Sequence, residues 1–189
     1  MTAFRPATAR DLPDVAATLA EAFAADPPTQ WVFPDGTAAL TRFFSGVAGR
    51  VHAAGGIVEL SPGTAAMLAL PPHAQLPDDP APGREGEMRN RLDAHHPHAP
   101  HYYLLFYGVR SAHQESGLGG RMLSRLTALA DRDRVGAYAE ASTWRGARLM
   151  LRHGFRHTRT LHLPDGPPMF PVWRNPIDDD PDRPRGTGS

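Results

Sequence analysis

Hydrophobic residues recur at helical spacing in two stretches of the amino-terminal half. Apolar positions three and four residues apart predict one helix over residues 11–24, with Thr8 and Asp11 as its cap, and a second over residues 37–54. Shorter apolar runs bounded by glycine and proline predict strands instead. The strands predicted in this half are residues 4–7, 57–60 and 65–70, of which the last two form a hairpin around the turn at 61–64.

The carboxyl-terminal half alternates between strand and helix patterns. An aromatic and β-branched run from Tyr102 to Val109 predicts a strand, and Leu118 begins an amphipathic helical pattern. Residues 136–142 predict another strand, and residues 143–151 predict a short helix that Gly154 closes as a C-cap. The last predicted elements are the two arms of a hairpin, residues 156–163 and 169–173.

Three segments lack such a pattern. Residues 30–36 predict an aromatic bend, in which Trp31 and Phe33 either fill the core or line a pocket. Residues 71–87 are rich in proline, glycine and acidic residues and predict a loop, either mobile or closing over a site, before a short helix at 87–95. The acidic, proline-rich tail over residues 176–189 predicts disorder, which leaves one domain over residues 1–175.

Composition restricts the class of protein. The 189 residues suit one domain, and a hydrophobic content of 41% can support a core. With 20 basic and 20 acidic residues the formal net charge is zero, so no general attraction to nucleic acid or anionic membranes is expected. The absence of cysteine excludes disulfides and thiolate chemistry. With no apolar run of transmembrane length and no signal-peptide pattern, we expect a cytoplasmic protein.

A group of histidines precedes the strand that begins near Tyr102. Pro97 and Pro100 interrupt the group, and the spacing matches no known zinc pattern. We therefore expect no metal site, and a histidine at the mouth of a substrate pocket fits the pattern better. The four histidines are His95, His96, His98 and His101.

The connection between the strand and the helix near residue 115 is rich in glycine. The first N–H groups of a helix lack intrahelical partners and carry partial positive charge, and Gly117, Gly119 and Gly120 have no Cβ to hinder a diphosphate. A dinucleotide motif would need glycine at Met122, and a P-loop would need G-K-[ST] where the chain reads Gly-Arg-Met. The pattern that fits is Q-x-x-G-x-G, which begins at Gln114; the alternative is an ordinary glycine-rich connection.

This pattern, after a strand that ends in Gly-Val, resembles the coenzyme-A loop of the GNAT superfamily of N-acetyltransferases. The block from Ala139 to Phe155 is similar to the second GNAT signature, commonly L-E-A-S-x-x-R-N-x-x-L-Y-x-x-x-G-F. An F-A-x-D-P pattern from Phe23 to Pro27 extends the resemblance over nearly all of the chain before the tail. Within the superfamily, the branch that includes puromycin N-acetyltransferase is the most similar.

The resemblance implies an α/β (α+β) fold, with a mixed, strongly bent sheet of six to seven strands and helices on both faces. The fourth and fifth strands are expected to splay apart, so that the pantetheine arm of acetyl-CoA lies between them. Backbone groups of Tyr107 and Val109 would pair with the pantetheine, and those from Gln114 to Arg121 would hold the diphosphate. The positions implied for the cosubstrate are Tyr107, Val109, Gln114, Glu115, Ser116, Gly117, Leu118, Gly119, Gly120 and Arg121.

Three positions depart from the GNAT pattern. Glu115 and the serine after it stand where the family usually has glycine and a basic residue, so a carboxylate lies near the phosphates. Arg110 and Arg121 are expected to offset its charge. In the second signature, Gly146 replaces the usual asparagine, and Met150 replaces the tyrosine that often serves as general acid.

The chemistry implied by the resemblance needs a base more than an acid. The leaving thiolate has a conjugate acid of pKa about 8.5, whereas a primary amine with a pKa near 10 must lose a proton before it attacks. Glu140, at the end of the fifth strand, is the leading candidate for this base; its alternative is a structural carboxylate bonded to backbone or arginine. Tyr138, His101 and His113 are further candidates for relaying the proton. The residues expected to contact the acceptor are Trp31, Phe33, His101 and Tyr103.

The resemblance therefore implies an acetyl-CoA-dependent N-acetyltransferase that acetylates a primary amine of a small molecule, such as an antibiotic or a metabolite, by direct attack. A backbone N–H of the fourth strand would hold the tetrahedral oxyanion. A catalytically silent acyl-CoA-binding or regulatory protein is the alternative, supported by Glu115, Gly146 and Met150. The sequence does not distinguish a longer acyl donor or an oxygen acceptor, and it allows a monomer or a homodimer.

Overall fold

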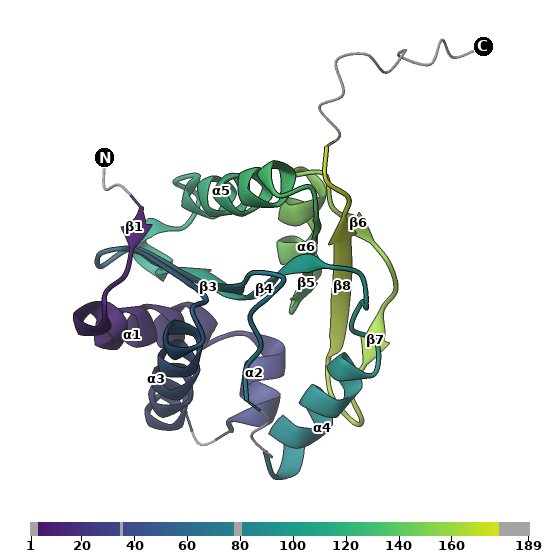
Figure 1. Ribbon diagram of the computed structural model, residues 1–189. Helices are drawn as coiled ribbons and strands as arrows, with labels where there is room; N and C mark the ends of the chain where they lie inside the picture. The colour runs from purple at the N-terminus through teal and green to yellow at the C-terminus, as the bar shows by residue number, and fades with distance from the viewer. Residues whose placement is uncertain (1–3, 35, 78–80, 178–189) are drawn as a thin grey trace, which may run out of the picture.

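The sheet of this protein has eight strands, and helices cover both of its faces (Figure 1). The structure is a computed structural model that describes residues 4–34, 36–77 and 81–177. Within these residues the strand order is β1-β2-β3-β4-β5-β8-β6, β7 also pairs with β8, and only β4 and β5 run parallel. The strands are β1 (Arg5–Pro6), β2 (Ile57–Ser61), β3 (Ala65–Leu70), β4 (His101–Val109), β5 (Gly136–Ala141), β6 (Arg156–His157), β7 (Leu161–His162) and β8 (Pro168–Arg174).

Each face of the sheet has its own buried apolar cluster. α1 and α3 pack on one face, and α5 and α6 pack on the other (Figure 1). Two further helices, α2 and α4, contact each other below the sheet in this view. The α-helices are α1 (Leu12–Phe23), α2 (Pro27–Val32), α3 (Thr37–Ala53), α4 (Gly83–Asp93), α5 (Leu118–Arg132) and α6 (Trp144–Leu151), and 3₁₀-helices cover Ala9–Asp11 and Ser111–His113.

The apolar stripe of α5 illustrates how the sequence forms these layers. Met122, Leu123 and Leu126 are fully buried against the sheet, while the opposite face of the helix carries its charged residues. Each such side chain contributes about 1.5–3 kcal/mol when it leaves water. The burial fixes the direction of α5, and hence the position of its amino terminus beside the end of β4.

Most of the predicted elements are confirmed, including the capping box of Thr8 and Asp11. Gly154, the glycine predicted to close the helix over residues 143–151, has a φ of 85°. The final hairpin differs, because its first arm is interrupted between β6 and β7. The sheet therefore has one strand more than the six to seven expected. The mixed α/β architecture with helices on both faces is as expected.

Two predicted segments are wrong in detail. The expected aromatic bend at residues 30–36 is in part the helix α2, which Asp26 caps by accepting from the Thr29 backbone N–H at 3.2 Å. The helix expected at 87–95 begins earlier, at Gly83, inside the segment expected to be a loop. Both helices are short or nearly devoid of buried apolar residues, so hydrophobic spacing gives little signal for either.

Within the described residues, β4 pairs with β3 up to its end but with β5 only over its first four residues. Its parallel pairing with β5 runs from His101 with Gly136 to Leu104 with Ala139, and no further pair between the two strands follows in the described chain. At the same point β4 contains a bulge against β3, because Leu104 and Phe106 pair with consecutive residues and Leu105 is extra. The expected splay of the fourth and fifth strands is thus confirmed.

Two further predictions concern the carboxyl-terminal tail and membrane-spanning segments. The tail predicted to be disordered covers residues 176–189. Residues 178–189 lie outside the described part of the chain, and only residues 176 and 177 are described. The Ile177 backbone N–H donates to Asp131 Oδ1 at 2.8 Å. None of the described helices has the length and apolar character needed to cross a membrane.

Candidate functional site

One cavity of about 1610 Å³ occupies the gap between β4 and β5. On the α5 and α6 side its wall includes Tyr107, Val109 and the glycine turn before α5. On the α1 and α3 side its wall includes Tyr103, Phe106 and Glu140, which alternates along β5 with alanines of the opposite face. The cavity therefore connects the two faces of the sheet at the position where the parallel strands part.

The turn that leads into α5 leaves the first N–H groups of the helix without a side-chain cap. Gly117 is the N-cap residue with a φ of 80°, and no side chain of the described residues caps the helix there. Two residues earlier, Glu115 has a φ of 65°, a left-handed conformation that costs a non-glycine residue about 1–2 kcal/mol. Strain of this kind concentrates at ligand sites, and an uncapped helix amino terminus attracts anions.

The two glycines of the first turn of α5 lie against neighbouring side chains. A Cβ at Gly119 would meet Leu149 Cδ2 at 3.2 Å, and a Cβ at Gly120 would meet His153 Nε2 at 3.3 Å. Both distances are shorter than ordinary contacts, so each neighbouring side chain would have to shift by a few tenths of an ångström to admit a Cβ. The glycines therefore let the first turn of α5 pack closely against these two side chains.

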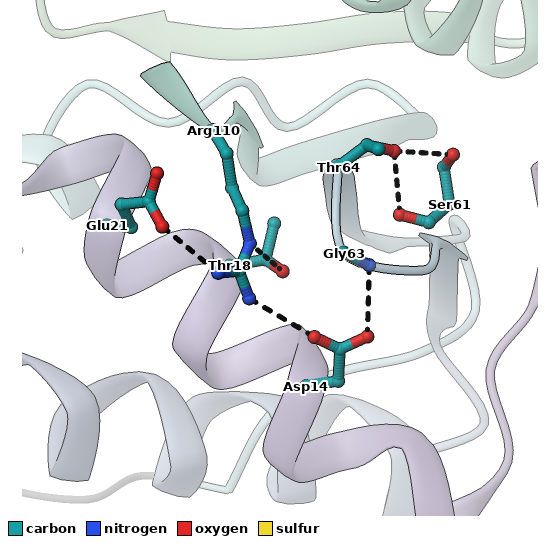
Figure 2. A network of polar contacts seen from close by, with 7 residues as sticks. All are labelled: Asp14, Thr18, Glu21, Ser61, Gly63, Thr64 and Arg110. Carbon is teal, nitrogen blue, oxygen red and sulfur yellow. Dashed lines mark hydrogen bonds and ion pairs between the residues drawn. The ribbon is translucent and has the colours of Figure 1, made fainter. Parts of the chain in front are cut away.

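The side chain of Arg110, the residue after β4, extends over α1 (Figure 2). Its Nε donates to Thr18 Oγ1 at 3.1 Å, and its Nη1 donates to Glu21 Oε2 at 3.0 Å. Its Nη2 donates to Asp14 Oδ1 at 3.2 Å, and the other Asp14 oxygen accepts from the Gly63 backbone N–H at 3.3 Å. The network ties the end of β4 to α1 and to the turn between β2 and β3.

The charge of Glu115 is met by a different arginine from those expected. Arg145 on α6 donates to Glu115 Oε1 at 3.1 Å, and both side chains are largely exposed. Arg110 is engaged on α1, and the Arg121 guanidinium lies over the Phe4 ring at 5.7 Å. The expectation that Arg110 and Arg121 offset this carboxylate is therefore wrong.

Glu140 is the ionisable group at the centre of the cavity. Its Oε1 is buried and has no hydrogen-bond partner among the described residues, although the side chain as a whole is reachable from the cavity. Burial raises the pKa of Glu140 to about 7, and the nearby Asp93 raises it further, against the opposing effect of the Tyr103 and Tyr138 hydroxyls. The group is therefore poised between acid and carboxylate near neutral pH.

Two tyrosines lie beside this carboxyl group on the same face of the sheet. Tyr103 and Tyr138 are register partners on β4 and β5, and their ring centroids are 5.8 Å apart. Burial raises the pKa of both phenols, and the charge of Glu140 raises them further, so both stay neutral. The Tyr138 hydroxyl is buried and, like Glu140 Oε1, finds no hydrogen-bond partner within the described chain.

Two of the four clustered histidines form a pair at the cavity wall. His101 Nδ1 lies 2.7 Å from the Ala99 carbonyl oxygen, which only accepts, so this nitrogen carries the proton and Nε2 accepts from His96 Nε2–H at 3.1 Å. Burial lowers the pKa of both rings, and for His96 the charges of His101 and His98 help to bring it to about 4. Among the described residues no group of three or more His, Asp or Glu side chains is arranged to hold a metal ion.

The structure brings most of the predicted site residues to one cavity but leaves four outside its wall. Trp31 lies against Gly166, with Arg84 over its ring at 5.2 Å, and Tyr138 is buried behind the wall. Ser116 and Arg121 also do not line the cavity. The predicted residues that do line it are Phe33, His101, Tyr103, Tyr107, Val109, Gln114, Glu115, Gly117, Leu118, Gly119, Gly120 and Glu140.

Several residues of the cavity were not foreseen from the sequence. Arg145 contacts Glu115 from 30 positions away, and Asp93 reaches the Glu140 region from α4. Phe43 and Met88 line the same cavity from α3 and α4. Spacing along the chain carries no information about such contacts, although Arg145 falls on the arginine of the second signature.

No model of a known protein family matches the sequence. A solved structure described as histone acetyltransferase HPA2 and related acetyltransferase, from Corynebacterium glutamicum, is 26% identical, with a TM-score of 0.72 over 92% of this chain and 96% of that chain. The polyamine N-acetyltransferase of Drosophila melanogaster, described as forming N-acetylagmatine, is 17% identical, with a TM-score of 0.68 over 92% and 99%. A chain in the NatC complex bound to Gag peptide and CoA is 11% identical, with a TM-score of 0.53 over 93% and 98%.

The extent of these matches, nearly end to end in both chains, decides the architecture. The chain has the GNAT fold. Two positions of the second GNAT signature lie on α6 beside the cavity. The Gly146 N–H donates to Thr143 Oγ1 at 3.1 Å in the first turn, and Met150 is almost fully buried. A thioether donates no proton, so the GNAT fold here has no general acid at Met150.

Proposed function

We propose that this protein is an acetyl-CoA-dependent N-acetyltransferase that acetylates a primary amine of a small molecule. The observation that carries the proposal is Glu140, whose buried Oε1 lacks a partner and whose pKa is about 7, in the wall of a cavity that continues to the uncapped amino terminus of α5. One end of this cavity suits an anionic cosubstrate, and the other suits a proton-donating amine.

The residues at the α5 end fit the charged part of coenzyme A. Backbone N–H groups from Gln114 to Arg121 would hold the diphosphate, helped by the dipole of α5. These contacts use the main chain, so they do not require the side chains of Ser116 and Arg121 to face the cavity. Backbone groups of Tyr107 and Val109 on the unpaired edge of β4 would bond the pantetheine arm.

Acetyl-CoA supplies an activated acyl group whose thiolate leaves near neutral pH with little acid assistance. The lack of a proton donor at Met150 is therefore compatible with transfer. A backbone N–H of β4 beyond Leu104, on the edge that β5 leaves unpaired, would stabilise the oxyanion. Such a donor is fixed by the β3 pairing on the other side of the strand.

Glu140 is the group we assign to the proton of the amine. A primary amine with a pKa near 10 is almost wholly protonated at pH 7, and a carboxylate with a pKa of about 7 is a stronger base than an ordinary glutamate. The ammonium proton would pass to Glu140 Oε1, directly or through water, before the neutral nitrogen attacks the thioester carbon; the C–S bond then breaks as the thiolate leaves, and the second N–H proton is released to solvent or to the thiolate. The proximity of the Tyr103 and Tyr138 hydroxyls, which lowers the pKa of Glu140 against the larger effect of burial, would favour the ionised form of this base.

The acceptor is expected to be an antibiotic or another metabolite, as the similarity to the puromycin N-acetyltransferase branch implies. Similar structures include enzymes described as acting on agmatine and polyamines, which supports an amine as the acceptor class. A cytoplasmic location is proposed from the sequence pattern alone.

A catalytically silent acyl-CoA-binding protein is the second candidate, and Met150 and Glu115 favour it, because one removes the usual acid and the other places negative charge near the phosphate site. Thiol release from acetyl-CoA, measured against a panel of primary amines with mass spectrometry of the products, separates the two. The first function requires acetylated amine and equimolar thiol. CoA binding by calorimetry without any turnover would leave only the second, and absence of CoA binding would exclude both.

A further inference from the structure

The acceptor side of the cavity has an aromatic wall. Phe33, Phe43 and Phe106 line the cavity from the α2 end, α3 and β4. The ring centroids of Phe33 and Phe43 are 5.0 Å apart, and those of Phe43 and Phe106 are 5.8 Å apart at an interplanar angle of 86°. The rings hold one another in place, so the wall exists before a ligand arrives.

The register of the strands places this wall next to Glu140. The last paired residues of β4 and β5 are Leu104 and Ala139, so Glu140 is level with the first residues of β4 beyond the pairing. Leu105 and Phe106 belong to the apolar cluster of the same face as Glu140. An amine that is hydrogen-bonded to Glu140 would therefore have its substituent directed toward Phe106 and toward the rings of Phe33 and Phe43.

The helix α4 adds further apolar surface to the cavity, beside its charged residues. Met88 and Leu92 of α4 line it, and both pack against the small cluster around Leu161 and Met169. Methionine adapts its shape to flat ligands and makes favourable contacts with aromatic rings. A ring-sized group would thus have apolar contacts on α4 as well as on the phenylalanines.

The other carboxylates that line this part of the cavity already have partners within the chain. Asp26 Oδ2 accepts from the Thr29 backbone N–H at 3.2 Å and from its hydroxyl at 2.9 Å. Glu85 accepts from Arg89 at 3.0 Å, and Asp93 also interacts with another group of the chain. A second ammonium group of a polyamine would share these carboxylates with the donors that already bind them, so it would find only a partly neutralised counter-charge.

We propose, on the basis of the function proposed above, that the preferred acceptor is a monoamine whose amino group is attached to an aromatic or similarly bulky apolar group. Phe33 and Phe43 determine this specificity by contacting that group, and Glu140 receives the single ammonium proton. A second cationic group on the acceptor lowers turnover, because the phenylalanine wall offers it apolar surface and the carboxylates of the cavity are already bonded to other groups of the chain.

The preference is tested with amines of similar length at saturating acetyl-CoA. We expect kcat/KM for 2-phenylethylamine to exceed that for agmatine and putrescine by about tenfold or more, with hexylamine between them. Equal or faster turnover of agmatine or putrescine would overturn the preference while leaving the N-acetyltransferase function intact. Turnover of no amine by a protein that binds CoA would overturn both proposals.

Matched phenylalanine variants test the assignment to residues. Phe43→Leu and Phe33→Leu should each lower the kcat/KM ratio of 2-phenylethylamine to hexylamine about three- to tenfold, with KM for acetyl-CoA unchanged. Phe44→Leu is the control. Phe44 is 1% exposed, and its ring centroid lies 5.2 Å from that of Phe43, but Phe44 does not line the cavity. We expect it to lower Tm without changing the ratio. An equal change of the ratio in Phe44→Leu would overturn the assignment.

Discussion

Arg145 on α6 and Glu115 in the turn before α5 form an ion pair with Nη2 and Oε1 3.1 Å apart. Because both side chains are largely exposed, the pair itself contributes at most about 1 kcal/mol to the free energy of unfolding. Its importance lies in its position, beside an uncapped helix amino terminus that would otherwise attract anions freely. The pair places a negative charge where the proposed diphosphate would bind.

Replacing Glu115 by glutamine is expected to strengthen CoA binding. Removing the carboxylate takes away a repulsion of about 1 kcal/mol and frees Arg145 to face phosphate, so Kd should fall about three- to tenfold. Calorimetry at low and high salt measures the effect, which should shrink as salt screens the charges. Glu87→Gln is the control for charge, since Glu87 is exposed and does not line the cavity. Unchanged or weaker binding in Glu115→Gln would contradict the placement of the diphosphate.

Replacing Glu140 by glutamine is expected to reduce kcat about 10²- to 10⁴-fold with CoA affinity unchanged, because glutamine accepts no proton. In the unmodified enzyme kcat/KM should rise with pH through a limb near pH 7, where Glu140 loses its proton. The variant should lack this limb. Stopped assays from pH 5.5 to 9 with one amine provide both readings, and a variant that keeps a third of the activity with the same pH profile would exclude Glu140 as the base.

The same variant should change stability in a pH-dependent way. The pKa of Glu140 is raised from 4.5 in the unfolded chain to about 7 in the folded protein, so the folded state loses stability as pH rises from about 4.5 through 7. At pH 8 the cost is about 3 kcal/mol, and at pH 4 it is close to zero. Glu140→Gln should therefore be more stable than the parent in urea at pH 8 but not at pH 4.

A control of opposite sign is available at Asp11. The Arg5 guanidinium and the Thr8 backbone hold the pKa of Asp11 well below its usual range, so its stabilising effect is present above the unfolded pKa and is lost as pH falls. Asp11→Asn should thus be less stable than the parent at pH 8. If Glu140→Gln, like Asp11→Asn, is less stable than the parent at pH 8, the assignment of the Glu140 pKa is wrong.

Replacing Arg110 by glutamine should raise KM for acetyl-CoA several-fold with a smaller effect on kcat. The guanidinium fixes the start of the turn before α5 to Asp14, Thr18 and Glu21, and glutamine cannot reach all three. Arg110→Lys should restore little of the parent KM for acetyl-CoA, since lysine lacks the planar guanidinium group that bonds several acceptors at once. Steady-state kinetics and a Tm measurement suffice, with the exposed Arg10 as the position for a control Arg→Gln change. Unchanged KM would show that the turn is positioned by other contacts.

The secondary structure could be predicted from the sequence wherever apolar residues mark the buried face of a helix or strand. The stripe of Met122, Leu123 and Leu126 predicts α5 because burial and helical spacing coincide. α2 and α4 were missed or misplaced because they bury few side chains; α4 buries only Gly86. The extra residue of the β4 bulge, Leu105, is likewise invisible in the pattern, because neighbouring apolar residues fit either face.

The candidate site was foreseen only where its residues are local in sequence. The glycine turn and Glu140 belong to continuous motifs, so the resemblance could place them. The pairing of Arg145 with Glu115 and the proximity of Asp93 to Glu140 depend on how distant helices pack. Trp31 was expected at the acceptor, but α2 turns it toward Gly166 instead, which no spacing rule predicts.

The parting of β4 and β5 has a mechanical consequence. In the part of the chain that the structure describes, only four residue pairs, from His101 with Gly136 to Leu104 with Ala139, join the amino-terminal and carboxyl-terminal halves of the sheet by main-chain pairing. A cosubstrate lying in the gap would bridge both halves like an inserted strand, and its binding free energy would add to that of folding. Cellular acetyl-CoA would then act as a folding ligand, and a starved cell would hold this protein in a looser, more protease-sensitive form.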